Sequence, residues 1–368
     1  MEFRVHKGEF LTTLYWTQSI VERRHTMPIL ANVLIEAQKG EVRVVATDLE
    51  VGVRSGIKGE ILTEGEISVN ARKLYEIVRE SPDEVVQVKG LENDWVEIKS
   101  GKSKFKMVGI NAKEFPQFPQ FAMEKLIPVP IKILREMIEK TIFSVSSDET
   151  RHNLNGVFVE EADKGMVRMV ATDGHRLALI ERSIGSMGLD KGVIIPRKGL
   201  AELKKLLEES EEGVVSIGFQ DNMGLVTKDN VQLFMRLIDE DFPDYSKVVP
   251  KDNPYEMKVA KEGFLQALRR VSILSSERYK GVKIELKEGA MAISTNNPDL
   301  GEAVEEMEID YKGRLLSIGF NARYLLDVLG VLGNGGEIDV KVKDEVSPGL
   351  VTAEGDEHYL YVVMPMRL

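Results

Sequence analysis

One short stretch of this 368-residue chain combines residue types that could do chemistry. Residues 171–177 read ATDGHRL, so Asp173 stands two positions before His175. A histidine base oriented by a carboxylate is a common arrangement in hydrolases. The same words recur at 46–51 (ATDLEV) and, in degraded form, at 294–297 (STNN), where no histidine is present. No nucleophile is marked by a recognisable turn motif, so the sequence does not predict an enzyme.

Two other kinds of site are also not predicted. Residues 100–103 (SGKS) match the end of a phosphate-binding loop, but position 96 is valine where that motif requires glycine, and a hairpin turn explains the segment better. The absence of cysteine excludes thiolate metal ligands, disulfides and cysteine nucleophiles. We expect no metal and no cofactor, because metal-ligand spacing is absent among the five histidines, His6, His25, His152, His175 and His358.

The recurring words define a repeat. Thr47, Thr172 and Thr295 are separated by 125 and 123 residues. A second motif recurs with nearly the same period, at 69–74 (VNARKL), 195–200 (IPRKGL) and 320–325 (FNARYL). A third feature, an apolar residue followed by proline, recurs at 115–116, 242–243 and 364–365. A fixed period of this length indicates duplication of a domain-sized unit. We therefore predict three domains, at 1–122, 123–249 and 250–368.

Each third shows the pattern of two amphipathic helices and several short strands. Apolar residues recur at helical spacing in six windows, and alternating apolar residues bounded by turn signals indicate antiparallel strands. The fold class predicted is α+β, with helices packed on antiparallel sheets. The expected helices lie at 9–22, 71–80, 131–143, 198–209, 261–275 and 321–332, and the strands of the second third at 155–160, 166–171, 176–181, 214–219, 224–227 and 231–237.

Composition is that of a soluble globular protein, with 43% hydrophobic and 30% charged residues. No stretch approaches the length of a membrane span and no leader pattern is present, so a cytoplasmic location is expected. The net charge of −11 opposes binding to nucleic acid. The six helix windows nevertheless hold 13 Lys or Arg against 11 Asp or Glu. The excess of acidic residues therefore lies in the strands and loops. A solvated mixture of charges on helix faces is the simpler alternative.

Four segments found in this order resemble one family. They are 154–156 (LNG), 171–178 (ATDGHRLA), 241–245 (DFPDY) and 361–368 (YVVMPMRL). Together with the threefold repeat, they resemble the bacterial sliding clamp, the β subunit of DNA polymerase III, over the whole chain. The resemblance implies a non-catalytic processivity factor in which two head-to-tail subunits of three domains form a six-domain ring around duplex DNA, without sequence specificity. The partners implied are the polymerase III catalytic subunit, the clamp loader complex, and other replication and repair proteins. A three-repeat peptide-binding scaffold that does not bind DNA remains the alternative.

The resemblance also implies a groove for partner peptides between the second and third domains. Its methionines and aliphatic side chains would accept varied apolar groups, while His175, Arg176 and Arg367 could read polar groups at the rim. Three departures from the family pattern, at Asn153, Lys247 and Pro348, affect the neighbourhood of the groove. A final edge strand packed on its own domain is the simpler explanation of the tail. The matching positions are Thr172, Gly174, His175, Arg176, Leu177, Pro243, Lys247, Val248, Tyr324, Val362, Met364, Pro365, Met366 and Arg367.

A dimer interface and a DNA-facing set follow from the same resemblance. A strand over 102–107 with Phe105 as its apolar anchor would meet a third-domain surface of the partner subunit, although Phe105 could equally serve its own core. The expected interface residues are Lys102, Lys104, Phe105, Met107, Ile273, Leu274, Glu302, Glu305 and Glu306. The expected DNA-facing residues are Arg24, Arg72, Lys73, Lys198 and Arg269.

Overall fold

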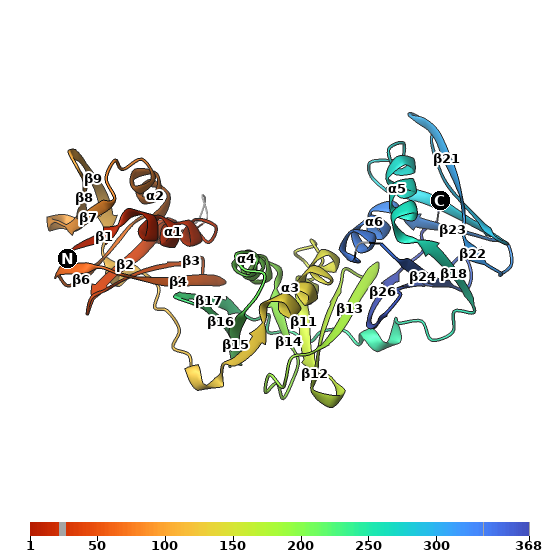
Figure 1. The fold of residues 1–368 in the computed structure, drawn as a ribbon, viewed down its shortest axis with the longest axis horizontal. Helices are drawn as coiled ribbons and strands as arrows, with labels where there is room; N and C mark the ends of the chain where they lie inside the picture. Colours follow the sequence, from red (N-terminus) through yellow and green to blue (C-terminus); the bar gives the residue numbers. More distant parts are fainter. Residues whose placement is uncertain (22–26, 334, 368) are drawn as a thin grey trace. The chain divides into compact units, whose positions relative to one another are not determined.

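A computed structural model describes residues 1–21, 27–333 and 335–367 of the chain (Figure 1). The predicted α+β class is confirmed, since six α-helices accompany antiparallel sheets in the described residues. The predicted helix windows are also confirmed, with ends that move by at most four residues. The helices are α1 (Lys7–Gln18), α2 (Ala71–Arg79), α3 (Ile131–Glu139), α4 (Arg197–Glu208), α5 (Lys261–Ser272) and α6 (Ala322–Val331).

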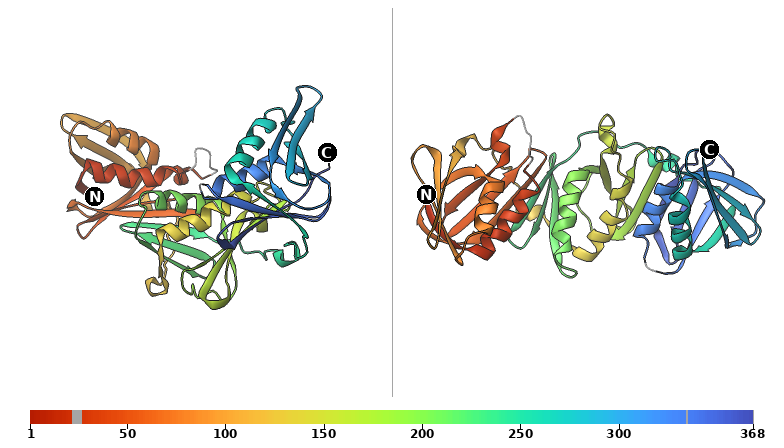
Figure 2. Two further views of the ribbon diagram at one scale, coloured as in Figure 1. Left: turned by 45° about the vertical axis from the view of Figure 1, so that its right-hand side comes forward. Right: turned by 90° about the horizontal axis from the view of Figure 1, so that it is seen from above.

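The chain divides into two compact units. Unit 1 comprises residues 1–132 and 198–237. It contains one 13-stranded antiparallel sheet, with α1 against α2 and against strands β3 and β4 (Figure 2). In sheet order the strands are β10 (Ile127–Pro130), β15 (Val214–Gln220), β16 (Met223–Lys228), β17 (Val231–Arg236), β4 (Val51–Lys58), β3 (Glu41–Thr47), β2 (Asn32–Gln38), β6 (Gly65–Asn70), β9 (Ser103–Ile110), β8 (Trp95–Ser100), β7 (Val85–Gly90), β1 (Glu2–His6) and β5 (Glu60–Thr63).

Unit 2 comprises residues 133–197 and 238–368, and it contains two sheets. Helices α5 and α6 pack against each other, and strand β26 joins the strands of the second third to those of the last. The nine-stranded sheet has the order β14 (Val193–Pro196), β11 (Gly156–Glu161), β12 (Met166–Thr172), β13 (Arg176–Ser183), β26 (Asp356–Val363), β25 (Gly349–Ala353), β24 (Glu337–Val342), β18 (Tyr255–Ala260) and β22 (Asp310–Tyr311). The four-stranded sheet has the order β21 (Gly301–Glu308), β20 (Ala290–Asn297), β19 (Gly281–Lys287) and β23 (Leu316–Asn321).

The repeated sequence motifs have local structural roles. Asn70 and Asn321, in the second motif, both cap a helix by accepting a backbone N–H of its first turn. Two lysines, at the starts of α1 and α5, join these helices to the ends of α2 and α6. Lys7 Nζ donates to the carbonyl of Ser81, just after α2, and the buried Lys261 donates to the carbonyl of Leu332, just after α6. The first and last copies of the repeat therefore use the same contacts to hold α1 to α2 and α5 to α6.

The predicted strands of the second third are all present, as β11, β12, β13, β15, β16 and β17. The short strands β10 and β14 were not predicted. The sheet ladder continues from β4 to β17 and from β13 to β26, so each sheet passes beyond the thirds that the repeat predicts. The exact domain boundaries therefore stay a prediction.

An ion-pair network in unit 2 joins segments more than 200 residues apart in sequence. Arg182 Nη2 lies 2.6 Å from Glu136 Oε1 and 2.7 Å from Asp356 Oδ2, and Lys140 Nζ lies within 2.8 Å of the same two oxygens. Burial raises the pKa of both carboxyls, but the hydrogen bonds from Arg182 and Lys140 outweigh burial, so both pKa values are lowered. The network thus connects α3, β13 and β26 through two carboxylates that are ionised only above acidic pH.

The lowered pKa of Asp356 predicts acid sensitivity. The network stabilises the fold above the unfolded-state pKa of about 4, and it loses this contribution as pH falls through the lower folded-state value. Asp356→Asn should lower the free energy of unfolding by about 1–3 kcal/mol at pH 7, and should make it fall less between pH 7 and pH 3. Urea denaturation at both pH values measures this. The exposed Asp190→Asn is the control, and an unaltered pH dependence in Asp356→Asn would contradict the prediction.

Candidate functional site

The sequence ATDGHR folds into a tight turn between β12 and β13. The Thr172 hydroxyl donates to the carbonyl of Arg176 (2.6 Å) and accepts the N–H of Gly174 (3.1 Å). Asp173 Oδ1 accepts the N–H groups of His175 (2.9 Å) and Arg176 (3.1 Å). Gly174 has a φ of 88°, a conformation that glycine adopts without strain. The side chains of Thr172 and Asp173 therefore replace the backbone partners that a turn lacks.

The first copy of the motif builds the same turn. Thr47 bonds to the carbonyl of Val51 and to the N–H of Leu49, while Asp48 Oδ1 accepts two further N–H groups, as in the second copy. Leu49 takes the place of Gly174 with a φ of 79°. The third copy differs, because Thr295 donates to Gly281 instead. The acid in the motif is thus a turn former, which removes the reason to regard Asp173 and His175 as a catalytic pair.

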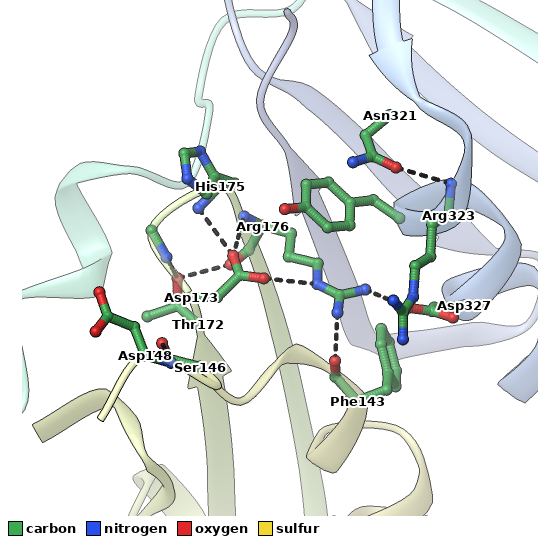
Figure 3. A network of polar contacts seen from close by, with 12 residues as sticks. Phe143, Ser146, Asp148, Thr172, Asp173, His175, Arg176, Asn321, Arg323 and Asp327 are labelled. Carbon is green, nitrogen blue, oxygen red and sulfur yellow. Dashed lines mark hydrogen bonds and ion pairs between the residues drawn. The ribbon is translucent and has the colours of Figure 1, made fainter. Parts of the chain in front are cut away.

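Arg176 is the most heavily bonded residue at the site (Figure 3). Its side chain is only 8% exposed, and its nitrogens donate to Asp173 Oδ2 (3.0 Å), to Asp327 Oδ2 on α6 (2.6 Å) and to the carbonyl of Phe143 (2.5 Å). The guanidinium also lies over the ring of Tyr324, 4.5 Å from its centroid. The prediction that Arg176 reads partner groups at a rim is therefore replaced by an interior role.

Burial lowers the pKa of Arg176, but Tyr361 and the two aspartates outweigh burial and raise the pKa above its ordinary value. The guanidinium therefore stays charged at any pH at which the protein is folded. Tyr361 is buried beside it, and its hydroxyl donates to the carbonyl of Tyr324 (2.9 Å). Asp327 was not predicted as a site residue. A buried arginine requires carboxylate partners, but the sequence does not indicate which carboxylate, because Asp327 is 151 residues away.

The C-terminal tail follows directly from β26, which is paired on both sides. Leu177 on β13 is opposite Val362, and β25 pairs with the other edge of β26. The alternative in which the final strand is an edge strand is therefore wrong. Beyond β26, Met364 N–H donates to the carbonyl of His175 (2.9 Å), and Met366 N–H donates to the carbonyl of Gly319 (2.8 Å). The backbone of the tail is thus fixed beside the turn.

An apolar cluster lies beneath the predicted groove. Leu177 and Val362 expose 2% each and pack with Val170 and Leu179, while the linker after β17 contributes Phe242, Tyr245 and Val249. Two predicted groove residues present apolar surface to solvent, Val248 (46% exposed) and Met364 (38% exposed). The His175 ring is exposed and stacks on the ring of Tyr324, with 6.5 Å between the ring centroids. Among the remaining predicted residues, Pro243, Lys247 and Arg367 are exposed and Pro365 and Met366 are partly buried.

Unit 2 therefore contains all the predicted groove residues. The linker is held by Tyr245, whose hydroxyl bonds to Glu160 and accepts from Arg168 Nη1 (2.6 Å). Burial raises the pKa of Tyr245 to about 12, so it remains an intact hydroxyl. Tyr245 and Arg168 were not predicted as site residues. The three residues that depart from the family pattern have partners in unit 2: Asn153 donates to the carbonyl of Asp241, Lys247 pairs with Asp244 (3.0 Å), and the carbonyl of Pro348 accepts from Asn253.

The predicted DNA-facing residues have different surroundings. Arg72 and Lys73 are exposed on α2 and both pair with Glu76, and Arg269 is exposed on α5. Lys198 instead forms an ion pair with the buried Asp48 of the first turn, so its charge is neutralised within unit 1. Arg24 lies outside the described residues.

The predicted interface residues occupy two strands and one helix end. Phe105 (36% exposed) and Met107 (partly buried) lie on β9, the exposed Lys102 immediately before it, and Glu302, Glu305 and Glu306 on β21. Ile273, just after α5, is 74% exposed and Leu274 is partly buried. Two expected partners are already paired within their own unit. Lys104 lies 2.6 Å from Glu97, and Glu305 bonds to Arg270.

The described residues hold no cluster of three or more His, Asp or Glu that could bind a metal ion. None of their helices has the length and apolar character needed to cross a bilayer.

Comparison with known proteins identifies the family. Models of the N-terminal, central and C-terminal domains of the DNA polymerase III beta subunit match residues 1–119, 128–244 and 246–367. The beta sliding clamps of Caulobacter vibrioides and Vibrio cholerae are 36% and 35% identical, each over 100% of both chains. A crystal structure of the C. crescentus beta sliding clamp has a TM-score of 0.95 at 36% identity over 100% of both chains. The Bacillus subtilis clamp has a TM-score of 0.95 at 32% identity, covering 100% of this chain and 99% of its own. The chain therefore belongs to the bacterial β sliding clamp family, the β subunit of DNA polymerase III.

Proposed function

We propose that two copies of this chain close head to tail into a ring around duplex DNA, and that the ring tethers the DNA polymerase III catalytic subunit, the clamp loader and other replication and repair proteins in the cytoplasm. The observation that carries the assembly is a pair of open sheet edges, one in each unit. The clamp itself is proposed to do no chemistry, since Asp173, the acid beside His175, builds a turn.

The open edges lie on β9 and β21. Strand β9 is paired along β8 on one side, but on its other side only residues 109–110 pair, with β6. Strand β21 ends the four-stranded sheet and, among the described residues, pairs only with β20. Unpaired strand edges are a hazard that soluble proteins usually cover. Pairing β9 of one subunit with β21 of the other covers both edges and continues the two sheets.

The apolar and charged residues beside these edges fit the same contact. Phe105 is close to one edge, and Val304 (65% exposed) lies on the other. Lys104 and Lys106 project from β9, and Glu302 and Glu306 from β21. Opposite charges on facing strands favour this pairing over like-with-like pairing of β9 with β9.

Binding to DNA requires only weak, non-specific cationic contacts. The helix windows carry a net charge of +2 although the whole chain carries −11. Phosphate contacts position a protein without reading sequence, so a modest surplus of helical cations such as Arg72, Lys73 and Arg269 allows sliding. Lys198 is neutralised by Asp48, which lies outside the helix windows, so 12 Lys or Arg remain against 11 Asp or Glu and the surplus is +1.

Partner peptides are proposed to bind along the tail. Exposed Val248 and Met364 supply apolar contacts, and the thioether of methionine adapts to different side chains. His175 and Arg367 remain exposed for polar contacts, in contrast to Arg176.

Loading onto DNA tests the ring directly. In the presence of a clamp loader, the protein should remain on nicked circular DNA and should be released when the circle is cut, because topological binding ends at a free DNA end. Gel filtration of the DNA before and after cutting measures this. Retention on linear DNA at the same salt concentration would indicate direct affinity and would contradict the ring.

Removal of residues 364–368 tests the groove. The deletion removes the hydrogen bonds from Met364 to His175 and from Met366 to Gly319, together with exposed apolar surface. A short polymerase-derived peptide should no longer bind by isothermal titration calorimetry, while sedimentation should still report the dimer. Undiminished peptide affinity would refute the assignment of the groove.

Charged substitutions test the interface. Phe105→Asp combined with Ile273→Asp should yield monomers by sedimentation velocity at micromolar concentration, because a buried unpaired carboxylate is costly at an interface. Val346→Asp, at another exposed apolar residue, is the control and should leave the dimer intact. Dimers in the double variant would show that the interface is elsewhere.

A further inference from the structure

The structure contains a second surface built like the predicted groove, at the join between β4 and β17 in unit 1. The pairing of Gly52 with Phe234 matches the pairing of Leu177 with Val362 in unit 2. The two turns that precede these positions are built alike, and Gly52 follows Thr47 at the same interval as Leu177 follows Thr172. Gly52 and Phe234 therefore correspond in position to Leu177 and Val362, which form the apolar floor of the predicted groove.

Each surface is followed by a linker with the same aromatic spacing. Residues 115–118 read FPQF and residues 242–245 read FPDY. Both linkers cover the strands beside their own floor, with Phe115 and Phe118 in one apolar cluster and Phe242 and Tyr245 in the other. Phe118 is therefore the counterpart of Tyr245.

Phe118 lies directly on the floor of the surface in unit 1. A Cβ atom added to Gly52 would come within 2.8 Å of two atoms of the Phe118 ring, so the ring uses the space that the missing side chain leaves. The ring meets Phe234 edge-on at 4.3 Å between centroids. The guanidinium of Arg54 covers it at 4.8 Å, and burial lowers the pKa of this arginine.

Tyr245 is held over different strands in unit 2. Its hydroxyl bonds to Glu160 on β11 and to Arg168 on β12, and Arg168 is fixed in turn by Glu181. In unit 1 the residue equivalent to Arg168 is Arg43. The residue opposite Arg43 is Gly56, in place of the glutamate opposite Arg168, and Arg43 pairs with Glu41 instead. Phenylalanine has no hydroxyl to make such a bond. The two linkers therefore differ because one aromatic ring is tied to a charged network and the other is free to fill the floor.

We propose that the surface formed by Gly52, Arg54 and Phe234 is a second recognition groove, and that residues 115–118 of the same chain occupy it permanently, with Phe118 as the anchor. The chain therefore offers one accessible peptide groove, in unit 2, and keeps its counterpart in unit 1 filled. This inference rests on the proposed function for the comparison of the two surfaces, but the occupancy of the surface in unit 1 can be tested separately.

The test supplies the linker as a separate peptide. A labelled peptide of residues 113–121 is titrated, by fluorescence anisotropy, into the full-length Phe118→Ala variant, in which the floor is vacated. It should bind with one site per chain, and it should bind roughly tenfold or more weakly to the wild-type chain, since burial of a phenylalanine is worth at least that factor. The matched control is the same peptide with alanine at the position of Phe118, which should lose this binding.

Deleting residues 364–368 from the Phe118→Ala variant separates this inference from the function proposed for the tail. Binding of the 113–121 peptide should survive that deletion, whereas binding of the polymerase-derived peptide should not. Equal binding of the two linker peptides, or loss of linker-peptide binding with the tail, would overturn the inference.

A second variant avoids the risk that Phe118→Ala fails to fold. Gly52→Ala places a methyl group against the Phe118 ring and should increase hydrogen exchange of residues 113–121 by about tenfold or more, with α2 unaffected. Unchanged exchange in the linker would show that Phe118 is not anchored on Gly52.

Discussion

The buried guanidinium of Arg176 is the interaction on which the geometry of the groove depends. It fixes the turn through Asp173, helix α6 through Asp327 and the segment after α3 through the carbonyl of Phe143. Leaving one member of such a buried pair without its partner costs about 3–5 kcal/mol. The tail then lies beside a turn whose backbone cannot move independently, and the carbonyl of His175 remains available to Met364. The proposed groove therefore has a turn and a tail that are held in place by the protein's own contacts.

Repetition explains how the chain acquired two similar surfaces with different uses. The Thr-Asp turn is preserved in the first and second copies, but its acid is paired differently in each. Asp173 holds Arg176, whereas Asp48 holds Lys198 from α4. The partly buried Asp173 takes a cation from its own turn, whereas the buried Asp48 takes one from a distant helix. The third copy lost the turn, since its threonine bonds to β19 instead.

The sequence predicted the six helices, the α+β class and the central strands because apolar periodicity and turn residues are local signals. The resemblance led to Arg176 being predicted as a groove residue and Lys198 as a DNA-facing residue, but it did not predict that both are held in ion pairs. The partners explain why. Asp327 is 151 residues from Arg176, and no local pattern specifies which carboxylate a buried cation will meet. Tyr245 was overlooked for the same reason, since its role depends on a hydroxyl that meets Glu160 and Arg168 on other strands.

Intramolecular pairing also affects how the proposed ring would close. Lys104 and Glu305 already have partners in Glu97 and Arg270, and the two lysines beside Glu97 lower the pKa of that carboxyl to about 2. An ion pair formed across the interface would therefore replace an existing one, and its net contribution would be small. The free energy of closure must come instead from burial of apolar side chains and from backbone pairing of β9 with β21. In the proposed ring, charge would then select the correct strand partner, while contact area would hold the ring closed.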